Sequence, residues 1–271
     1  VSVDCVCRLF GMTAGAEPVK ATFWLLDAPD SLAVQSHRNP DGTGIGFFDP
    51  DGGPHVEKQP IAAFEDRQFA AEAKEISSRT FVSHVRHATT GGLTVANTHP
   101  FCQHDRLFAH NGVIDDLPEL ERHLGEARAL VEGDTDSERY FALISKEIDR
   151  HAGDVGAGVE AAVGWIVENL SIVSINFVLV TASDLWALRY PEHHTLFVLE
   201  RPAGGGGSGA PKALVQTSSY GTQVRSEHAR DRPVVIVASE RMDDDPGWRE
   251  VSSGDLIHVD ASLVLTAESI V

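Results

Sequence analysis

The order of secondary-structure signals along the chain predicts an α+β fold, in which strands and helices form separate layers. Strand-like runs come first, helical patterns fill most of residues 116–170, and strand-like runs return from residue 171 onward. No internal repeat and no regular strand–helix–strand alternation is visible. A chain of 271 residues can bury about 75% of its unfolded surface, so a single domain is the expected organisation.

The first 110 residues combine strands with two helical segments. Apolar residues at helical spacing predict helix within 17–37, with a second helix start at Asp30-Ser31, and again within 64–78. Stretches rich in Gly, Pro, Asn and Asp predict turns at 37–44 and 49–53, the second being a hairpin loop. The predicted strands of this part are residues 7–13, 45–48, 80–85 and 106–110.

The remaining sequence divides into helices followed by strands. Helices are expected over 116–124, from a cap at Thr135 or Asp136 onward, and over 155–170. The glycine-rich run 204–209 is interpreted as a long hairpin loop rather than a boundary between domains. The predicted strands of this part are residues 172–181, 185–190, 195–200, 213–217, 234–239 and 256–259.

Composition and charge narrow the choice of partner and compartment. A formal net charge of −18 argues against nucleic-acid binding, which needs a basic face, and is typical of a soluble protein. No run approaches the ~18–20 apolar residues of a membrane span, and no secretory signal is visible. Three cysteines, Cys5, Cys7 and Cys102, then indicate a reducing, cytoplasmic setting.

Cys7 is the candidate nucleophile. Amide hydrolysis needs a nucleophile, a base and donors for the oxyanion. An N-terminal cysteine supplies the first two, because its α-amine (pKa about 7.7–8.0) and its thiol (about 8.5) both titrate near neutral pH. Taken alone, Cys7 before a predicted strand is also typical of a small apolar side chain in the core.

Asn111-Gly112 is the candidate oxyanion hole. The side-chain amide of Asn111 is a donor, and Gly112 allows a backbone N–H to approach a substrate closely. One such donor is worth about 10²–10³ in rate. The alternative is that Asn-Gly after an apolar strand forms a type I′ hairpin turn.

Arg86 and Asp136 are candidates for binding an α-amino acid. Arg86 lies where a strand is predicted to end, and its guanidinium is suited to gripping a carboxylate with two parallel bonds. Asp136, at a predicted helix start, would bind the ammonium group. The alternatives are a surface salt bridge for Arg86 and a helix cap for Asp136.

Five histidines lie within 27 positions, which raises the alternative of a metal site. They show no pair at the i, i+4 spacing of a helical zinc motif, so ordinary hydrogen-bonded histidines are the preferred interpretation. The five are His84, His87, His99, His104 and His110.

Taken together, these segments resemble the glutaminase domain of class II glutamine amidotransferases, which are N-terminal-nucleophile hydrolases. The stand-alone branch, with no fused synthase domain, is the most similar, and it includes γ-glutamyl amide hydrolases. The similarity is dense over residues 7–140 and looser afterwards. The segments that carry it are Cys7-Arg-Leu-Phe-Gly11, Arg86-His-Ala-Thr89, Asn97-Thr-His-Pro100, His110-Asn-Gly112 and Thr135-Asp-Ser-Glu138, in this order.

The resemblance implies a four-layer αββα sandwich and a role for each matching position. It implies that Cys7 is the nucleophile with its own α-amine as the base, and that Asn111 and Gly112 form the oxyanion hole. It further implies that Arg86 binds the substrate α-carboxylate and Asp136 its α-ammonium. The remaining implied pocket residues are His87, Thr89 and, as support, His99. No cofactor or metal is implied.

One departure from the family concerns the start of the chain. The family nucleophile is the first residue, yet six residues precede Cys7 here, which makes its nitrogen a peptide amide. The amine of Val1 can lie up to about 20 Å away along an extended segment. Residues 1–6 are therefore expected to be a removable leader or an incorrectly assigned start, with Val6 as the true one. The amidotransferase domain is then 7–271, and Cys5 is the weaker candidate nucleophile.

The expected activity is cleavage of a γ-glutamyl amide through a thioester at Cys7, releasing ammonia or an amine. The expected partners are glutamine or another γ-glutamyl small molecule and, for glutamine, a separate synthase that accepts ammonia. Neither nucleic acid nor membrane is an expected partner. The alternative is a non-catalytic module that binds an amino acid and whose nucleophile is blocked by the residues before it.

Overall fold

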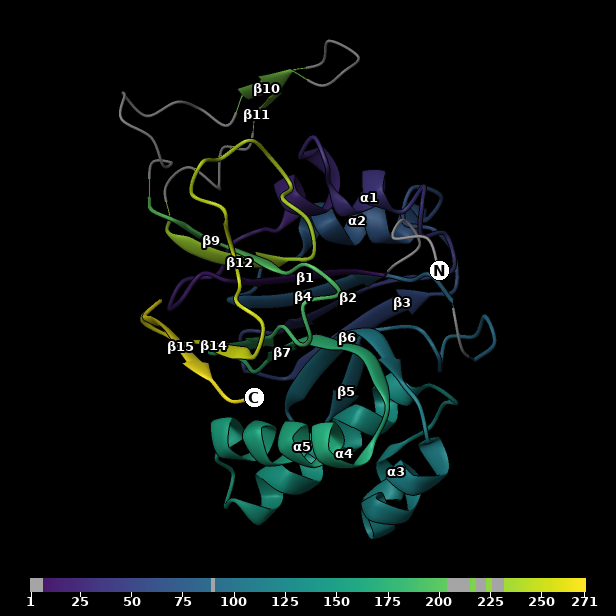
Figure 1. Cartoon of the computed structure of the whole chain (residues 1–271). Helices are drawn as coiled ribbons and strands as arrows, with labels where there is room; N and C mark the ends of the chain where they lie inside the picture. The colour runs from purple at the N-terminus through teal and green to yellow at the C-terminus, as the bar shows by residue number, and fades with distance from the viewer. Residues whose placement is uncertain (1–6, 89–90, 204–214, 218–222, 226–231) are drawn as a thin grey trace.

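Two stacked antiparallel sheets form the centre of the protein (Figure 1). The computed structural model describes residues 7–88, 91–203, 215–217, 223–225 and 232–271. The strand order of the first sheet is β13 (Arg249–Glu250), β9 (Phe197–Arg201), β12 (Val234–Ala238), β1 (Arg8–Thr13), β4 (Thr80–Val85), β2 (Thr43–Phe48) and β3 (Pro54–Gln59).

The second sheet has six strands and lies face to face with the first. Its order is β15 (Leu265–Ser269), β14 (Asp255–Val259), β8 (Leu185–Leu188), β7 (Ile172–Val180), β6 (Arg106–Ile114) and β5 (Phe101–Gln103). A separate two-stranded ribbon consists of β10 (Val215–Thr217) and β11 (Gln223–Arg225).

Helices cover the outer face of each sheet, so the molecule has four layers (Figure 1). The first sheet is covered by a π-helical turn, η1 (Phe23–Asp27), and by α1 (Leu32–Gln35) and α2 (Arg67–Glu75). The second is covered by α3 (Leu117–Leu124), the 3₁₀ segment η2 (Gly125–Leu130), α4 (Asp136–Arg150) and α5 (Val155–Asn169). The prediction of an αββα sandwich is confirmed.

Central strands are apolar on both faces because each sheet packs on both sides. In β12, Val234, Ile236 and Ala238 face the helices that cover the first sheet, whereas Val235 and Val237 face the second sheet. Three hydrophobic cores result: one under each helical layer and one between the sheets. The pocket described below lies at one end of the middle core.

Side-chain caps begin the longer helices. Asp66 accepts hydrogen bonds from two backbone N–H groups of α2, Thr135 accepts one from α4, and Asp154 accepts one from α5. Each such cap stabilises a helix by about 1 kcal/mol. Of the two residues proposed to cap α4, the structure selects Thr135.

Most predicted elements are present with shifted ends. The strand over 80–85 and the hairpin loop over 49–53 have the predicted bounds. The second helix start predicted at Asp30-Ser31 is confirmed, since Ser31 caps α1. The helix predicted before it is only the short η1, and Val19 forms a β-bridge with Ser78 instead of joining a helix. The strands β5, β11, β13 and β15 were not predicted, and β3 was implied only by the hairpin loop before it. The hairpin loop predicted over 204–209 lies outside the described residues.

Within the described ranges, no helix combines the length and apolar character that crossing a bilayer requires.

Candidate active site

Cys7 lies immediately before β1, at the end of the space between the two sheets. Leu9 belongs to the core between the sheets, and side chains alternate along a strand, so Cys7 is directed to the same side. Its Sγ donates to the carbonyl oxygen of His87 at 3.3 Å and accepts from the His87 N–H at 3.2 Å. Burial raises the pKa of the Cys7 thiol to about 11, although the hydrogen bond from His87 opposes the shift. The thiol is therefore protonated at neutral pH.

Arg86 is buried beside Cys7, because β1 and β4 pair with Arg8 opposite Val85. Its guanidinium donates to the carbonyl oxygens of Gly92 at 3.1 Å and Gly91 at 3.5 Å. Burial lowers the pKa of Arg86, and the charges of neighbouring acidic groups raise it again. The alternative of a surface salt bridge is wrong, because only 3% of Arg86 is exposed.

His87 follows on the same segment and is partly buried. Its Nδ1 lies 3.8 Å from Oδ2 of Asp41, and the same oxygen accepts the N–H of Ala88 at 2.8 Å. Asp41 therefore holds the segment that follows β4 against the first sheet. Thr89, a predicted pocket residue, lies outside the described residues.

Asn111 and Gly112 lie inside β6 and not in a turn, so the alternative of a type I′ turn is wrong. Asn111 pairs with Asn176 of β7, and Gly112 with Ile175. Leu107 and Ala109 belong to the core between the sheets, so Asn111 is directed into the same space as Cys7. A Cβ at position 112 would lie 1.7 Å from the carbonyl oxygen of Ser174, so only glycine fits there.

Asp136 is the first residue of α4 and is almost fully buried. Its Oδ2 accepts the backbone N–H of Ile114 in β6 at 2.9 Å, and its Oδ1 accepts the hydroxyl of Ser137 at 3.4 Å. The alternative that Asp136 caps its own helix is wrong, because the capping oxygen belongs to Thr135. The carboxylate instead ties the helix start to the neighbouring strand.

These side chains surround one pocket. Six of the eight predicted site residues line it: Cys7, Arg86, His87, His99, Gly112 and Asp136. Asn111 is buried next to Gly112 without lining the pocket. The lining residues that sequence reasoning did not assign to the site are His110, Thr135 and Ser137.

His110 and Ser137 had a signal in the sequence, since each adjoins a predicted site residue. His110 Nδ1 and Ser137 Oγ lie 2.9 Å apart, linking β6 to α4 beside Asp136. Desolvation lowers the pKa of His110, with Asp136 opposing the shift. A neutral imidazole is therefore expected there at neutral pH.

The other predicted histidines do not form a metal centre. The ring centroids of His84 and His99 lie 4.1 Å apart with the rings tilted by 35°, and burial lowers the pKa of both. His104 is exposed at the turn between β5 and β6. Among the described residues, no three or more His, Cys, Asp or Glu side chains are arranged to hold a metal ion.

Comparisons with known proteins give a consistent result. The sequence profile of the class-II glutamine amidotransferases matches residues 6–269. A γ-glutamyl-hercynylcysteine sulfoxide hydrolase from Mycolicibacterium smegmatis is 30% identical over 253 residues, which cover 89% of this chain and 92% of that protein.

Solved structures agree on the fold, which is that of N-terminal-nucleophile glutamine amidotransferases. A glutamine aminotransferase class-II domain protein from Silicibacter pomeroyi has a TM-score of 0.61 at 19% identity, covering 97% of this chain and 99% of that one. The glutamine phosphoribosylpyrophosphate amidotransferase of B. subtilis has a TM-score of 0.66 at 17% identity. The match covers 98% of this chain but 49% of the B. subtilis chain, so the protein spans about half of that enzyme's length.

Proposed function

The chain belongs to the class-II glutamine amidotransferases, and we propose that it hydrolyses a γ-glutamyl amide with Cys7 as the nucleophile. The observation that carries this proposal is one pocket that contains a thiol, a buried guanidinium and a buried carboxylate. Arg86 and Asp136 complement the carboxylate and ammonium of an α-amino acid, which have opposite charges on one carbon. The amide to be cleaved then lies at the Cys7 end of the pocket.

The reaction begins when Sγ of Cys7 attacks the γ-carbonyl carbon. The thiol proton passes to the base, and the carbonyl electron pair moves onto oxygen, where the Asn111 side-chain amide and the Gly112 N–H stabilise the negative charge. The tetrahedral intermediate collapses, the C–N bond breaks, and the leaving nitrogen takes the proton. Water then attacks the thioester, which releases glutamate and restores the thiol.

The base in this proposal is the α-amine of Cys7 itself. A thiol whose pKa is raised to about 11 does not ionise at neutral pH, so it needs a base within hydrogen-bond reach. An amine with a pKa of about 7.7–8.0 meets that need, whereas a peptide nitrogen does not. The active form is therefore the chain that begins at Cys7.

A substituted amide is the preferred substrate class, since a relative similar over nearly its whole length is named as a γ-glutamyl hydrolase. The other substrate that the proposal allows is glutamine itself, whose hydrolysis would supply ammonia to a separate synthase. The alternative from another class is a binding module that retains the Arg86–Asp136 pair. The six residues before Cys7 favour that alternative while they remain attached.

The test combines intact mass with activity. Protein from its native host is expected to have the mass of a chain starting at Cys7 and to release glutamate from L-glutamine or from γ-glutamyl anilides. Faster release from a γ-glutamyl alkylamide, whose leaving amine is as basic as ammonia, than from L-glutamine indicates a substituted-amide substrate. Cys7→Ala should lower glutamate release by about 10⁴-fold or more.

Cys102→Ala is the matched control, because Cys102 is also a free thiol but is exposed on β5. It should leave glutamate release unchanged. A chain that starts at Cys7 yet releases no glutamate from either substrate class would contradict the hydrolase proposal. If that chain still binds L-glutamate, the binding module becomes the better description.

A further inference from the structure

Arg86 and Asp136 belong to different layers of the fold. Arg86 follows a strand of the first sheet, whereas Asp136 begins a helix on the far side of the second sheet. An α-amino acid carries its carboxylate and ammonium on the same carbon, so the distance between these two side chains must be held within narrow limits. No single strand or helix sets that distance.

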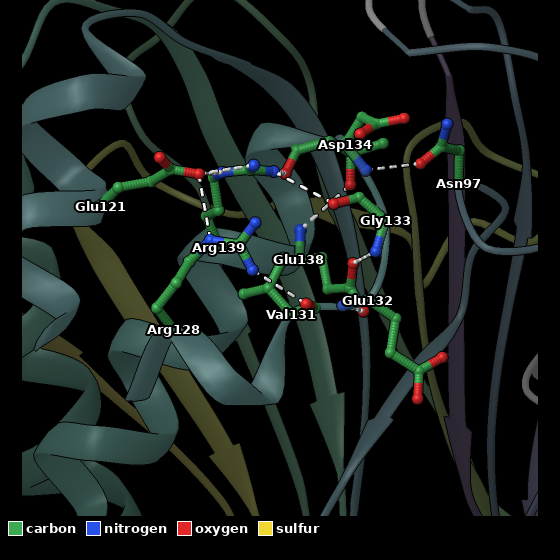
Figure 2. Close-up of polar contacts among 10 residues, drawn as sticks. Asn97, Glu121, Arg128, Val131, Glu132, Gly133, Asp134, Glu138 and Arg139 are labelled. Carbon is green, nitrogen blue, oxygen red and sulfur yellow. Dashed lines mark hydrogen bonds and ion pairs between the residues drawn. The ribbon is translucent and has the colours of Figure 1, made fainter. Parts of the chain in front are cut away.

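Asn97 forms hydrogen bonds with backbone groups next to both side chains. Its Oδ1 accepts the backbone N–H of Asp134 at 2.8 Å, two residues before Asp136 (Figure 2). Its Nδ2 donates to the carbonyl oxygen of Gly92 at 3.2 Å. The same oxygen accepts Nη1 of Arg86 at 3.1 Å. One buried amide therefore bridges the arginine side and the aspartate side of the pocket.

Two glycines lie so close to the side-chain amide of Asn97 that a Cβ at either position would crowd it. A Cβ at Gly133 would lie 2.5 Å from Oδ1 of Asn97, and a Cβ at Gly91 would lie 3.0 Å from its Nδ2. Gly91 also has φ +72°, which disfavours other residues. Asn97 is 1% exposed, so its position is determined by these backbone contacts and not by solvent.

The segment 131–135, which leads into α4, is held firmly enough to transmit a displacement to Asp136. The carboxylate of Glu138 accepts the N–H groups of Glu132 at 3.1 Å and Gly133 at 2.6 Å. Arg139 donates to the carbonyl oxygen of Thr135 at 2.9 Å. Glutamate and arginine side chains of the helix therefore fasten both ends of the segment.

A second anchor joins this segment to the preceding helices. Glu121 of α3 binds Arg139 at 2.6 Å and Arg128 at 3.1 Å, and Arg128 donates to the carbonyl oxygen of Val131 at 2.9 Å (Figure 2). Because the segment is fastened along its length, a shift at Asp134 is not absorbed locally. It moves the start of α4 and with it Asp136.

We propose that Asn97 is a positioning residue that sets the distance between the carboxylate-binding Arg86 and the ammonium-binding Asp136. The inference rests on the proposed function, since it assumes an α-amino acid in the pocket. Asn97 does not touch the substrate. It holds the two charged groups at the distance that one α-amino acid requires. Its loss therefore weakens the binding of ligands that contact both groups more than the binding of ligands that contact one.

The experiment compares two ligands on the full chain by calorimetry, which requires no turnover. L-Glutamate carries both the α-carboxylate and the α-ammonium, whereas glutarate lacks only the ammonium. The wild-type protein should prefer L-glutamate. Asn97→Asp cannot donate to Gly92 and places a negative charge beside its carbonyl oxygen, so it should reduce that preference about tenfold.

Asn169→Asp is the matched control, because Asn169 is an exposed residue at the end of α5 and the chemical change is the same. It should keep the wild-type preference. Thr94→Ala is a milder second variant that should fold, because Thr94 is exposed. Its Oγ1 accepts the Asn97 N–H at 3.3 Å, so its removal should shift the preference in the same direction by a smaller factor.

The outcomes separate the two proposals. An unchanged preference for L-glutamate in Asn97→Asp, or in Thr94→Ala where Asn97→Asp does not fold, overturns the role of Asn97 and leaves the proposed function intact. Equal weakening of both ligands also overturns it, since that result indicates general damage to the pocket. If the wild-type protein binds neither ligand, the proposed function itself fails.

Discussion

The two charged ends of the pocket are built in different ways. Arg86 donates to two carbonyl oxygens of the 91–92 turn, which lies in an exposed stretch of the chain. Asp136 accepts the N–H of Ile114 in β6 and starts a helix that is fastened by Glu138 and Arg139. The position of the arginine end depends on the 91–92 stretch and on the Asn97 bridge, whereas a strand and a helix packed together hold the aspartate end. The aspartate end is fixed, and the ligand must fit it.

The largest effect is expected from Asp136→Asn. Asparagine still accepts the N–H of Ile114 but loses the negative charge that we propose binds an ammonium group. Binding of L-glutamate should weaken about 100-fold, the value of a charge-assisted hydrogen bond at a rigid site, while binding of glutarate should change little. Calorimetry measures both. Asp115→Asn is the control, because Asp115 is an exposed carboxylate directly after Ile114. Unchanged L-glutamate binding would remove Asp136 from the site.

Acid is expected to damage the arginine end of the pocket. His84 lies on β4 next to Arg86, and burial lowers its pKa from 6.5 to about 3, with the charges of Arg86 and His110 adding to the shift. The folded state excludes a proton that the unfolded chain binds below about pH 6.5. The contribution of His84 to the free energy of unfolding is therefore present above pH 6.5 and is lost as the pH falls toward 3.

The size of that loss can be measured by chemical denaturation. Between pH 7 and pH 5, His84 alone should lower the free energy of unfolding by about 2 kcal/mol, about 25-fold in the folding equilibrium. His84→Gln should flatten this dependence, whereas His104→Gln, at an exposed turn, should not. Equal stability of the wild-type protein at pH 7 and pH 5 would refute the attribution of this pH dependence to His84.

Arg86→Lys should have the smallest of the three effects. Lysine keeps the charge but lacks the planar fork that makes two parallel bonds, so part of the attraction to a carboxylate remains. Binding of L-glutamate should weaken about tenfold, with Arg38→Lys as an exposed control. A larger effect than that of Asp136→Asn would reverse the comparison of the two ends, and no effect would exclude Arg86 from carboxylate binding.

The sequence alone was sufficient for elements with strong local signals. The strand over 80–85, the hairpin at 49–53, the proline near the start of α3 and the glycine after its end all have local physical causes. The α+β class followed from the order of these elements. Ordered motifs also singled out the residues that the fold brings to one pocket, because residue type limits the chemistry that a position can perform.

Only the tertiary structure decided the features that depend on distant partners. Asn111-Gly112 has a strong turn propensity, yet pairing with β7 and the close approach of Ser174 keep it inside a strand. Asp136 has the position of a helix cap, yet it bonds to a strand 22 residues away in sequence. Asn97 belongs to one of the motif segments, but the sequence did not indicate its bridging contacts, since they join Gly92 and Asp134 through space. Local propensity is worth a few tenths to 1 kcal/mol per residue, and the buried hydrogen bonds made on folding outweigh it.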